Sequence, residues 1–142
     1  MGQTYQSVVI NAPVEKVWKA IRAFNDAQWA PNVVTSIEST GSATGDQPGD
    51  TRVLNGVFHE TLVNLDDAAR TFTYSIDDGP PPVSKADVSH YRGVVSMRPI
   101  TEGGGTFVEW SSSWQKNDGP AGDFCHGIYV ALLGDMKKSL EG

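Results

Sequence analysis

The sequence has one cysteine, Cys125, and few basic residues. A single cysteine cannot form an internal disulfide, so a reducing, cytoplasmic location is expected. Eleven lysine and arginine residues against 17 acidic ones give a net charge of -6, which argues against binding nucleic acid or anionic membranes through basic patches. No apolar run reaches the roughly 18 residues of a membrane-spanning helix, so we expect neither membrane insertion nor a leader segment.

Motifs for metals, nucleotides and covalent catalysis are also missing. The histidines His59, His90 and His126 follow no metal-ligand spacing, so no metal is expected. Glycines 103–105 join two predicted strands and open no helix, which argues against a phosphate-binding loop. No G-x-S-x-G or Cys/His arrangement indicates acyl transfer. We therefore expect no cofactor.

The dominant pattern is a long alternation of apolar and polar residues. The 142 residues fit a single domain, 1–142. From residue 33 the alternation continues for most of the chain, broken by turn residues, which predicts strands joined by hairpins. Together with one earlier strand, this makes a sheet of seven antiparallel strands. The predicted strands are 5–10, 33–39, 51–56, 57–65, 70–77, 88–100 and 106–116.

Helical patterns flank these strands. After the first strand, Pro13 suits a first helical turn, an apolar stripe runs to Phe24, and a second short helical segment is expected around 29–31. Residues 119–140 carry one broad apolar face over about 30 Å, enough to cross a whole sheet. The sequence thus predicts an α+β domain with two short helices after the first strand and a curved sheet around a long C-terminal helix. A gap between sheet and helix would form a small-molecule pocket.

Three stretches carry a family resemblance: PVEKVWKAIRAF at 13–24, ETLVNLDDAARTFTYSIDDGP at 60–80, and HYRGVVSMRP followed by GTFVEWSSSWQ at 90–115. Over nearly its whole length the chain resembles the START-like, Bet v 1-like (SRPBCC) superfamily, specifically its polyketide cyclase/dehydrase branch. It also resembles the plant abscisic acid receptors of that superfamily. The resemblance implies the helix-grip fold, with a hydrophobic cavity between the sheet and the last helix, and no single ligand.

Glu60 is the first polar candidate that the resemblance identifies. In the receptors, a glutamate in the context found here at residues 60–67 faces the cavity and joins a polar network around the ligand. Strand alternation would turn Asn64 toward the same face as Glu60. The alternative is that Glu60 is paired with an arginine such as Arg52 or Arg92.

Tyr91 and Glu109 match family positions that point inward from the two longest strands. If Glu60 and Glu109 share a partly dry cavity, burial and mutual repulsion would raise the pKa of at least one of them. With Tyr91 donating to an oxyanion, these three residues would form a catalytic set for cyclisation or dehydration by general acid-base chemistry. The alternatives are a tyrosine that fills core space and a glutamate on the surface.

This register has a consequence for Trp110 and Trp114, which it turns outward. Two outward indoles need a cover, which a second copy in a homodimer or the other helical segment would provide. Otherwise, a bulge in the strand turns both tryptophans into the pocket.

The function expected from these features is binding of a hydrophobic small molecule, whether polyketide-like, aromatic or lipid, with catalysis left open. The receptors' ligand-binding lysine aligns near Ala30, where this chain has no cation, so a neutral ligand fits better than a carboxylate. The alternatives are a non-catalytic carrier or sensor, and a protein-interaction module of the co-chaperone type. The expected ligand-binding residues are Phe58, Leu62, Tyr74, Ile76, Val95, Met97, Phe107, Phe124, Ile128, Leu132 and Met136.

Overall fold

The computed structural model describes residues 1–141 and contains seven antiparallel strands and two helices. Strand order in the sheet is β1-β7-β6-β5-β4-β3-β2, so each strand pairs with its neighbour in sequence, except that β1 pairs with β7. The predicted α+β helix-grip fold is confirmed. The elements are β1 (Gly2–Ile10), α1 (Val14–Ile21), β2 (Ile37–Thr40), β3 (Thr51–Leu54), β4 (Phe58–Asp66), β5 (Thr71–Asp78), β6 (Ser89–Pro99), β7 (Thr106–Gln115) and α2 (Asp118–Leu140).

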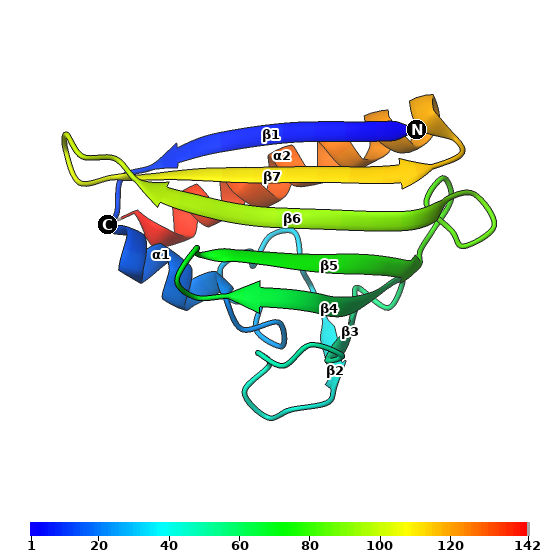
Figure 1. Cartoon of the computed structure of the whole chain (residues 1–142), viewed down its shortest axis with the longest axis horizontal. Helices are drawn as coiled ribbons and strands as arrows, with labels where there is room; N and C mark the ends of the chain where they lie inside the picture. The colour runs from blue at the N-terminus through cyan, green and yellow to red at the C-terminus, as the bar shows by residue number, and fades with distance from the viewer. Residues whose placement is uncertain (142) are drawn as a thin grey trace.

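Helix α2 runs along one face of the sheet, behind β1 and β7 in Figure 1, while α1 lies near the C-terminal end of α2. Over its 23 residues α2 buries one side, including Cys125, Tyr129 and Met136, as its apolar stripe predicts. Lys137 and Lys138 lie in its last turn, where positive charge favours the helix dipole. Among residues 1–141, no helix has the length and apolar character needed to cross a membrane.

The second short helix expected around 29–31 does not form. Residues 22–34 instead make separate turns, with Ala30 N donating to Ala27 O at 3.0 Å and Val34 N donating to Ala30 O at 2.9 Å. Pro31 has no N–H to continue a helix. The carboxylate of Asp135 on α2 accepts bonds from Asn32 N and Nδ2, both at 2.8 Å, and so fixes this segment against α2.

Local irregularities change which side chains face the helix. The pairing of β4 with β5 shifts between Leu62 and Asn64, so alternation fails there: Asn64 is exposed and Leu65 packs against the core instead. The expected inward direction of Asn64 is therefore wrong. A further shift lies in β6, where His90 has a φ of 56° and is exposed while Tyr91 is buried.

Strand β7 faces the opposite way from the expectation. Trp110 and Trp114 are 2% and 1% exposed, whereas Phe107 and Glu109 lie on the outer face. Pairing of β7 with β1 is regular along its length, so no bulge is involved. Burial of two indoles removes far more apolar surface from water than burial of one carboxylate would, and it leaves Glu109 in solvent. The tryptophans therefore need no cover from a second copy.

Gly93 provides the room that the aromatic core requires. On the sheet it lies beside Tyr74 of β5 and Ser112 of β7. A Cβ atom at this position would lie 2.2 Å from Cζ of Tyr74, which is an impossible contact. Because residue 93 has no side chain, the Tyr74 ring can cross β6 and reach β7 and α2.

We predict that Gly93→Ala lowers the free energy of unfolding by about 1–3 kcal/mol, because Tyr74 must leave its place. Gly127→Ala on α2 is the matched control, since a Cβ there meets nothing within 4 Å. The control is expected to gain up to about 1 kcal/mol from helix propensity. Urea denaturation of both variants measures the difference, and equal effects would contradict the proposed crowding at Gly93.

Candidate functional site

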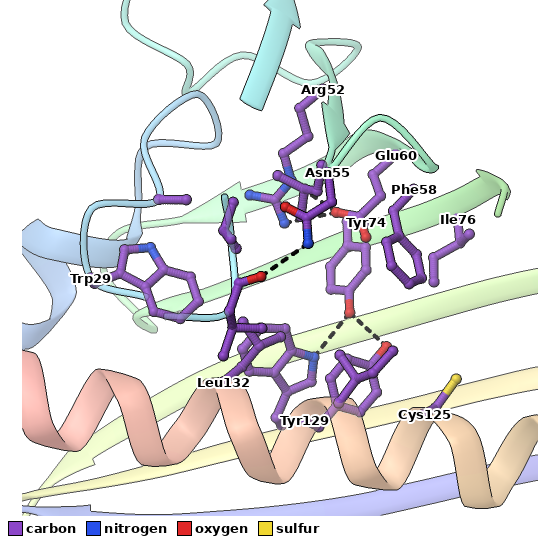
Figure 2. Close-up of a pocket in the computed structure, with 16 residues that line it drawn as sticks. Trp29, Arg52, Asn55, Phe58, Glu60, Tyr74, Ile76, Cys125, Tyr129 and Leu132 are labelled. Atoms are coloured by element: carbon purple, nitrogen blue, oxygen red, sulfur yellow. Dashed lines mark hydrogen bonds and ion pairs between the residues drawn. The ribbon is translucent and has the colours of Figure 1, made fainter. Parts of the chain in front are cut away.

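A cavity of about 50 Å³ lies between the sheet and α2, close to the β3–β4 turn. A space of this size holds a few water molecules. Figure 2 shows Tyr74 reaching across it from the sheet toward Tyr129 on α2, with Trp29 at one end and Ile76 at the other. The lining residues are mainly apolar: Ala27, Trp29, Val33, Val34, Arg52, Leu54, Asn55, Phe58, Glu60, Tyr74, Ile76, Trp110, Cys125, Ile128, Tyr129 and Leu132.

The charged wall of this cavity is one ion pair. Arg52 and Glu60 are directly opposite each other on β3 and β4, and Nε and Nη2 of Arg52 both lie 2.8 Å from Oε1 of Glu60. The Arg52 guanidinium also lies 3.8 Å above the ring of Phe24 and donates to Phe24 O at 3.2 Å. The two side chains are 5% and 6% exposed. Their charges cancel, so the cavity wall carries no net charge.

Burial raises the pKa of the Glu60 carboxyl above its ordinary value, because the charged form loses its water. The positive charge of Arg52 acts in the opposite direction and limits the rise. Within the described chain, every hydrogen bond to this carboxylate ends on Oε1. Its second oxygen, Oε2, is therefore free to accept a bond from a molecule in the cavity.

A chain of hydroxyl groups forms the opposite wall. Trp110 Nε1 donates to Tyr74 Oη at 3.0 Å, and Tyr74 donates to Tyr129 Oη at 2.8 Å. Tyr129 in turn shares a short hydrogen bond with Tyr91, whose hydroxyl donates to Cys125 Sγ at 3.3 Å. These groups satisfy one another, so the tyrosines give the cavity a rigid wall whose polar atoms are already occupied.

Burial also fixes the protonation of this chain. Loss of water raises the pKa of Tyr74, Tyr91 and Tyr129 far above the ordinary phenol value, so all three stay neutral. Burial raises the pKa of the Cys125 thiol as well, although its bond with Tyr91 acts the other way. A thiol with a raised pKa is a weak nucleophile at neutral pH.

Asn55 lines the cavity from the β3–β4 turn. Asn55 and Gly56 have positive φ values of 54° and 71°, as expected for this Asn-Gly turn. Asn55 Oδ1 accepts from Thr35 N at 2.8 Å, from Thr35 Oγ1 at 3.2 Å and from Ser36 N at 3.3 Å, and its Nδ2 donates to Val33 O at 2.9 Å. One side chain thus joins the β3–β4 turn to the segment before β2.

Trp29 leaves a second polar atom unused at the other end of the cavity. The indole is 6% exposed, and it packs against Trp110 with ring centroids 6.1 Å apart. Its Nε1 is buried and has no hydrogen-bond partner among residues 1–141. An unsatisfied buried N–H costs about 1–3 kcal/mol, so an acceptor at this position would be favourable.

The expected site residues divide into four groups. Glu60 lies in the cavity wall, and so do Phe58, Tyr74, Ile76, Ile128 and Leu132. Tyr91 is buried behind Tyr129, and Phe124 stacks on Phe58 at the rim with ring centroids 6.3 Å apart. Phe107 and Glu109 face away from the cavity, which corrects their expected inward direction. The remaining expected residues, Leu62, Val95, Met97 and Met136, are buried in the core and do not line the cavity.

Glu109 belongs to the opposite side of the sheet. Its Oε2 accepts a hydrogen bond from the exposed Tyr5 hydroxyl at 2.5 Å. The sheet therefore separates Glu109 from Glu60. The expected pair of facing glutamates is replaced by the ion pair of Glu60 with Arg52, the alternative that the sequence left open.

Several lining residues were missed in the sequence. Tyr129 could have been found, since it lies four residues after Cys125 on the buried stripe of α2. Trp110 was assigned to the wrong face by the expected register. Trp29, Val33 and Val34 lie in the turns before β2, where the strand expected from residue 33 has not yet begun, and only contacts of this segment with α2 and with Asn55 bring it to the cavity. In the described part of the chain, no three side chains of metal-binding type cluster together.

Comparison with known proteins identifies the family. The family model described as polyketide cyclase/dehydrase and lipid transport matches residues 1–142. The chain therefore belongs to the polyketide cyclase/dehydrase and lipid transport family, within the SRPBCC proteins, as its sequence segments indicate. No curated protein matches the chain.

Solved structures agree with this membership. A protein from Nitrosospira multiformis is 38% identical, has a TM-score of 0.94, and is matched over 99% of this chain and 97% of its own. The protein XoxI from Bacillus cereus is 28% identical with a TM-score of 0.77, over 99% of this chain and 96% of its own. An uncharacterised protein from Bacillus thuringiensis has the same identity and TM-score, with 98% of each chain matched.

The hydroxyl chain yields a stability prediction. Tyr129→Phe removes its central hydroxyl and leaves Tyr74 without an acceptor in a buried place. We expect the free energy of unfolding to fall by about 1–3 kcal/mol. Tyr5→Phe removes the exposed hydroxyl bonded to Glu109 and is expected to leave stability unchanged. Chemical denaturation measures the stability of both variants. An unchanged stability of Tyr129→Phe would mean that the hydroxyl chain contributes nothing to the free energy of unfolding.

Proposed function

We propose that this protein binds an apolar small molecule in the cavity between the sheet and α2, as a carrier or sensor. The observation that carries the proposal is the composition of this cavity, which combines aromatic and aliphatic walls with one neutralised ion pair. Apolar cavities with a few oriented polar groups are the usual form of ligand sites. Membership of a family described by both cyclase/dehydrase activity and lipid transport agrees with such a ligand.

Entry of a ligand requires side chains at the mouth to move. The cavity of about 50 Å³ is smaller than any polyketide or lipid. Phe58, Val34 and Ile128 line it and are only partly buried, so their outward rotation enlarges the space at little cost in lost packing. Asn55 holds the closed form through bonds that water can replace when the mouth opens.

Binding is favoured over acid-base catalysis by the surroundings of Glu60. Cyclisation or dehydration needs a side chain that can remove a proton and a side chain that can return one, whether one group or two. Of the residues that line the cavity, Glu60 is the one carboxylate, and its negative charge is paired with the positive charge of Arg52. The buried tyrosines are too weakly acidic to donate a full proton near neutral pH.

An interaction module has less support. The surface patch expected around Trp110 and Trp114 is absent, because both indoles are buried. The exposed large apolar side chains lie on several separate elements: Met1, Tyr5, Val9, Val57, Val63 and Val130. Scattered apolar residues are normal on soluble proteins and do not indicate a partner.

A mouth-filling variant tests the proposed function. Ile128→Trp places an indole where the ligand must enter, so we expect the affinity for the neutral fluorescent probe 1-aminoanthracene to fall at least tenfold. Val130→Trp, on the exposed side of the same helix at 52% exposure, is the matched control and should bind normally. Fluorescence titration measures both. No binding of the probe by the wild-type protein, or equal affinity of both variants for it, would contradict the proposal.

The role of Asn55 is tested by Asn55→Gly, which preserves the positive φ and removes the side-chain bonds to residues 33–36. We expect 1-aminoanthracene to associate several times faster, because the mouth opens more often. Asn117→Gly is the control, since Asn117 also has a positive φ of 52° and lies outside the cavity lining. Stopped-flow fluorescence gives both rates, and unchanged association in Asn55→Gly would argue against a closed mouth.

A further inference from the structure

The polar atoms of the cavity are not equally available to a ligand. The hydroxyls of Tyr74 and Tyr129 are used within the hydroxyl chain, and Asn55 is occupied by residues 33–36. Two buried groups remain: Glu60, whose Oε2 accepts no bond within the described chain, and Trp29, whose Nε1 has no partner there. Beside Tyr74 and Phe58, the polar atom left for a bound molecule is therefore the second carboxylate oxygen of Glu60.

We propose that Glu60 determines ligand specificity, so that the cavity accepts neutral aromatic molecules bearing a hydroxyl group and rejects the corresponding carboxylates. This inference rests on the proposed function and adds the chemical class of the ligand. Figure 2 shows the Glu60 carboxylate between Arg52 on one side and the rings of Tyr74 and Phe58 on the other. A hydroxyl placed against these rings donates to Oε2 of Glu60.

Charge explains the rejection of carboxylates. Arg52 is the one cation that lines the cavity, and Glu60 already occupies it with two contacts of 2.8 Å. A ligand carboxylate would meet no free positive charge and would face a second carboxylate in a site with little water. Two like charges in such a place repel each other strongly.

The pocket should therefore change its preference when Glu60 loses its charge. Arg52 would then be uncompensated and would attract an anion. The other titratable or charged groups facing Glu60 are Tyr74 and Asp77 of β5 and Tyr129 and Cys125 of α2. Burial raises the pKa of both tyrosines and of Cys125, so these groups stay neutral under acid conditions, and Asp77 is exposed and bonded to Thr61 and Ser75.

Three matched probes test the inference on the wild-type protein: 2-naphthol, 2-methoxynaphthalene and 2-naphthoate. They share a ring system and differ in carrying a hydrogen-bond donor, no donor, or a negative charge. At about pH 7 we expect 2-naphthol to bind at least tenfold more tightly than either of the other two, measured by calorimetry or by quenching of tryptophan fluorescence.

Glu60→Gln removes the charge and preserves the size of the side chain. In this variant 2-naphthoate should gain at least tenfold in affinity and bind more tightly than 2-naphthol. Glu109→Gln is the matched control on the outer face and should keep the wild-type order. Burial raises the pKa of Glu60, so in the wild-type protein lowering the pH should strengthen 2-naphthoate binding as Glu60 takes up a proton, and Glu60→Gln should lack this dependence.

The possible results separate the two proposals. If none of the three probes nor 1-aminoanthracene binds, the proposed function fails. If the probes bind without preference, or if Glu60→Gln folds and keeps the wild-type order, the specificity inference alone is overturned. Should Glu60→Gln fail to fold, the wild-type ranking and its pH dependence still decide, since equal affinity for 2-naphthol and 2-methoxynaphthalene contradicts the inference.

Discussion

The contact between Trp110 of β7 and Tyr129 of α2 is the interaction on which the rest of the structure depends. Their rings stack with centroids 4.9 Å apart, which joins the longest helix to the sheet. Tyr74 meets Trp110 edge-on at 6.3 Å and bonds to both partners. Aromatic pairs of this kind contribute beyond the area they bury. The cluster therefore sets the spacing between sheet and helix, and with it the size of the cavity.

The spacing between sheet and helix leaves polar groups in a place with little water. Some of these groups form hydrogen bonds with one another, and others form an ion pair. The tyrosines bond to one another, and Arg52 is paired with Glu60 and stacked on Phe24. A buried ion pair contributes little net stability, since desolvation offsets most of the attraction. Its main effect here is on the electrostatics of the cavity. The pair neutralises the cation of Arg52 and leaves the second carboxylate oxygen of Glu60 without a partner within the described chain.

Sequence reasoning succeeded where a repeating pattern fixed the outcome and failed where one residue shifted it. The burial of Glu60 follows from alternation along β4, and the turn at Asn55 follows from its Asn-Gly chemistry. Alternation could not reveal the shift after Leu62. On β7 the family resemblance chose a register that buries a glutamate, whereas the burial of Trp110 decided otherwise.

The sequence by itself determined most of the strand and helix pattern, the family, and the broad apolar face of the last helix, because these depend on local periodicity and turn chemistry. Only the tertiary structure decided which groups meet in the cavity. Trp29 comes from an irregular segment that is fixed by hydrogen bonds to Asp135 and Asn55. Tyr74 crosses β6 because Gly93 has no side chain. Such contacts depend on packing between distant elements, which no local pattern encodes.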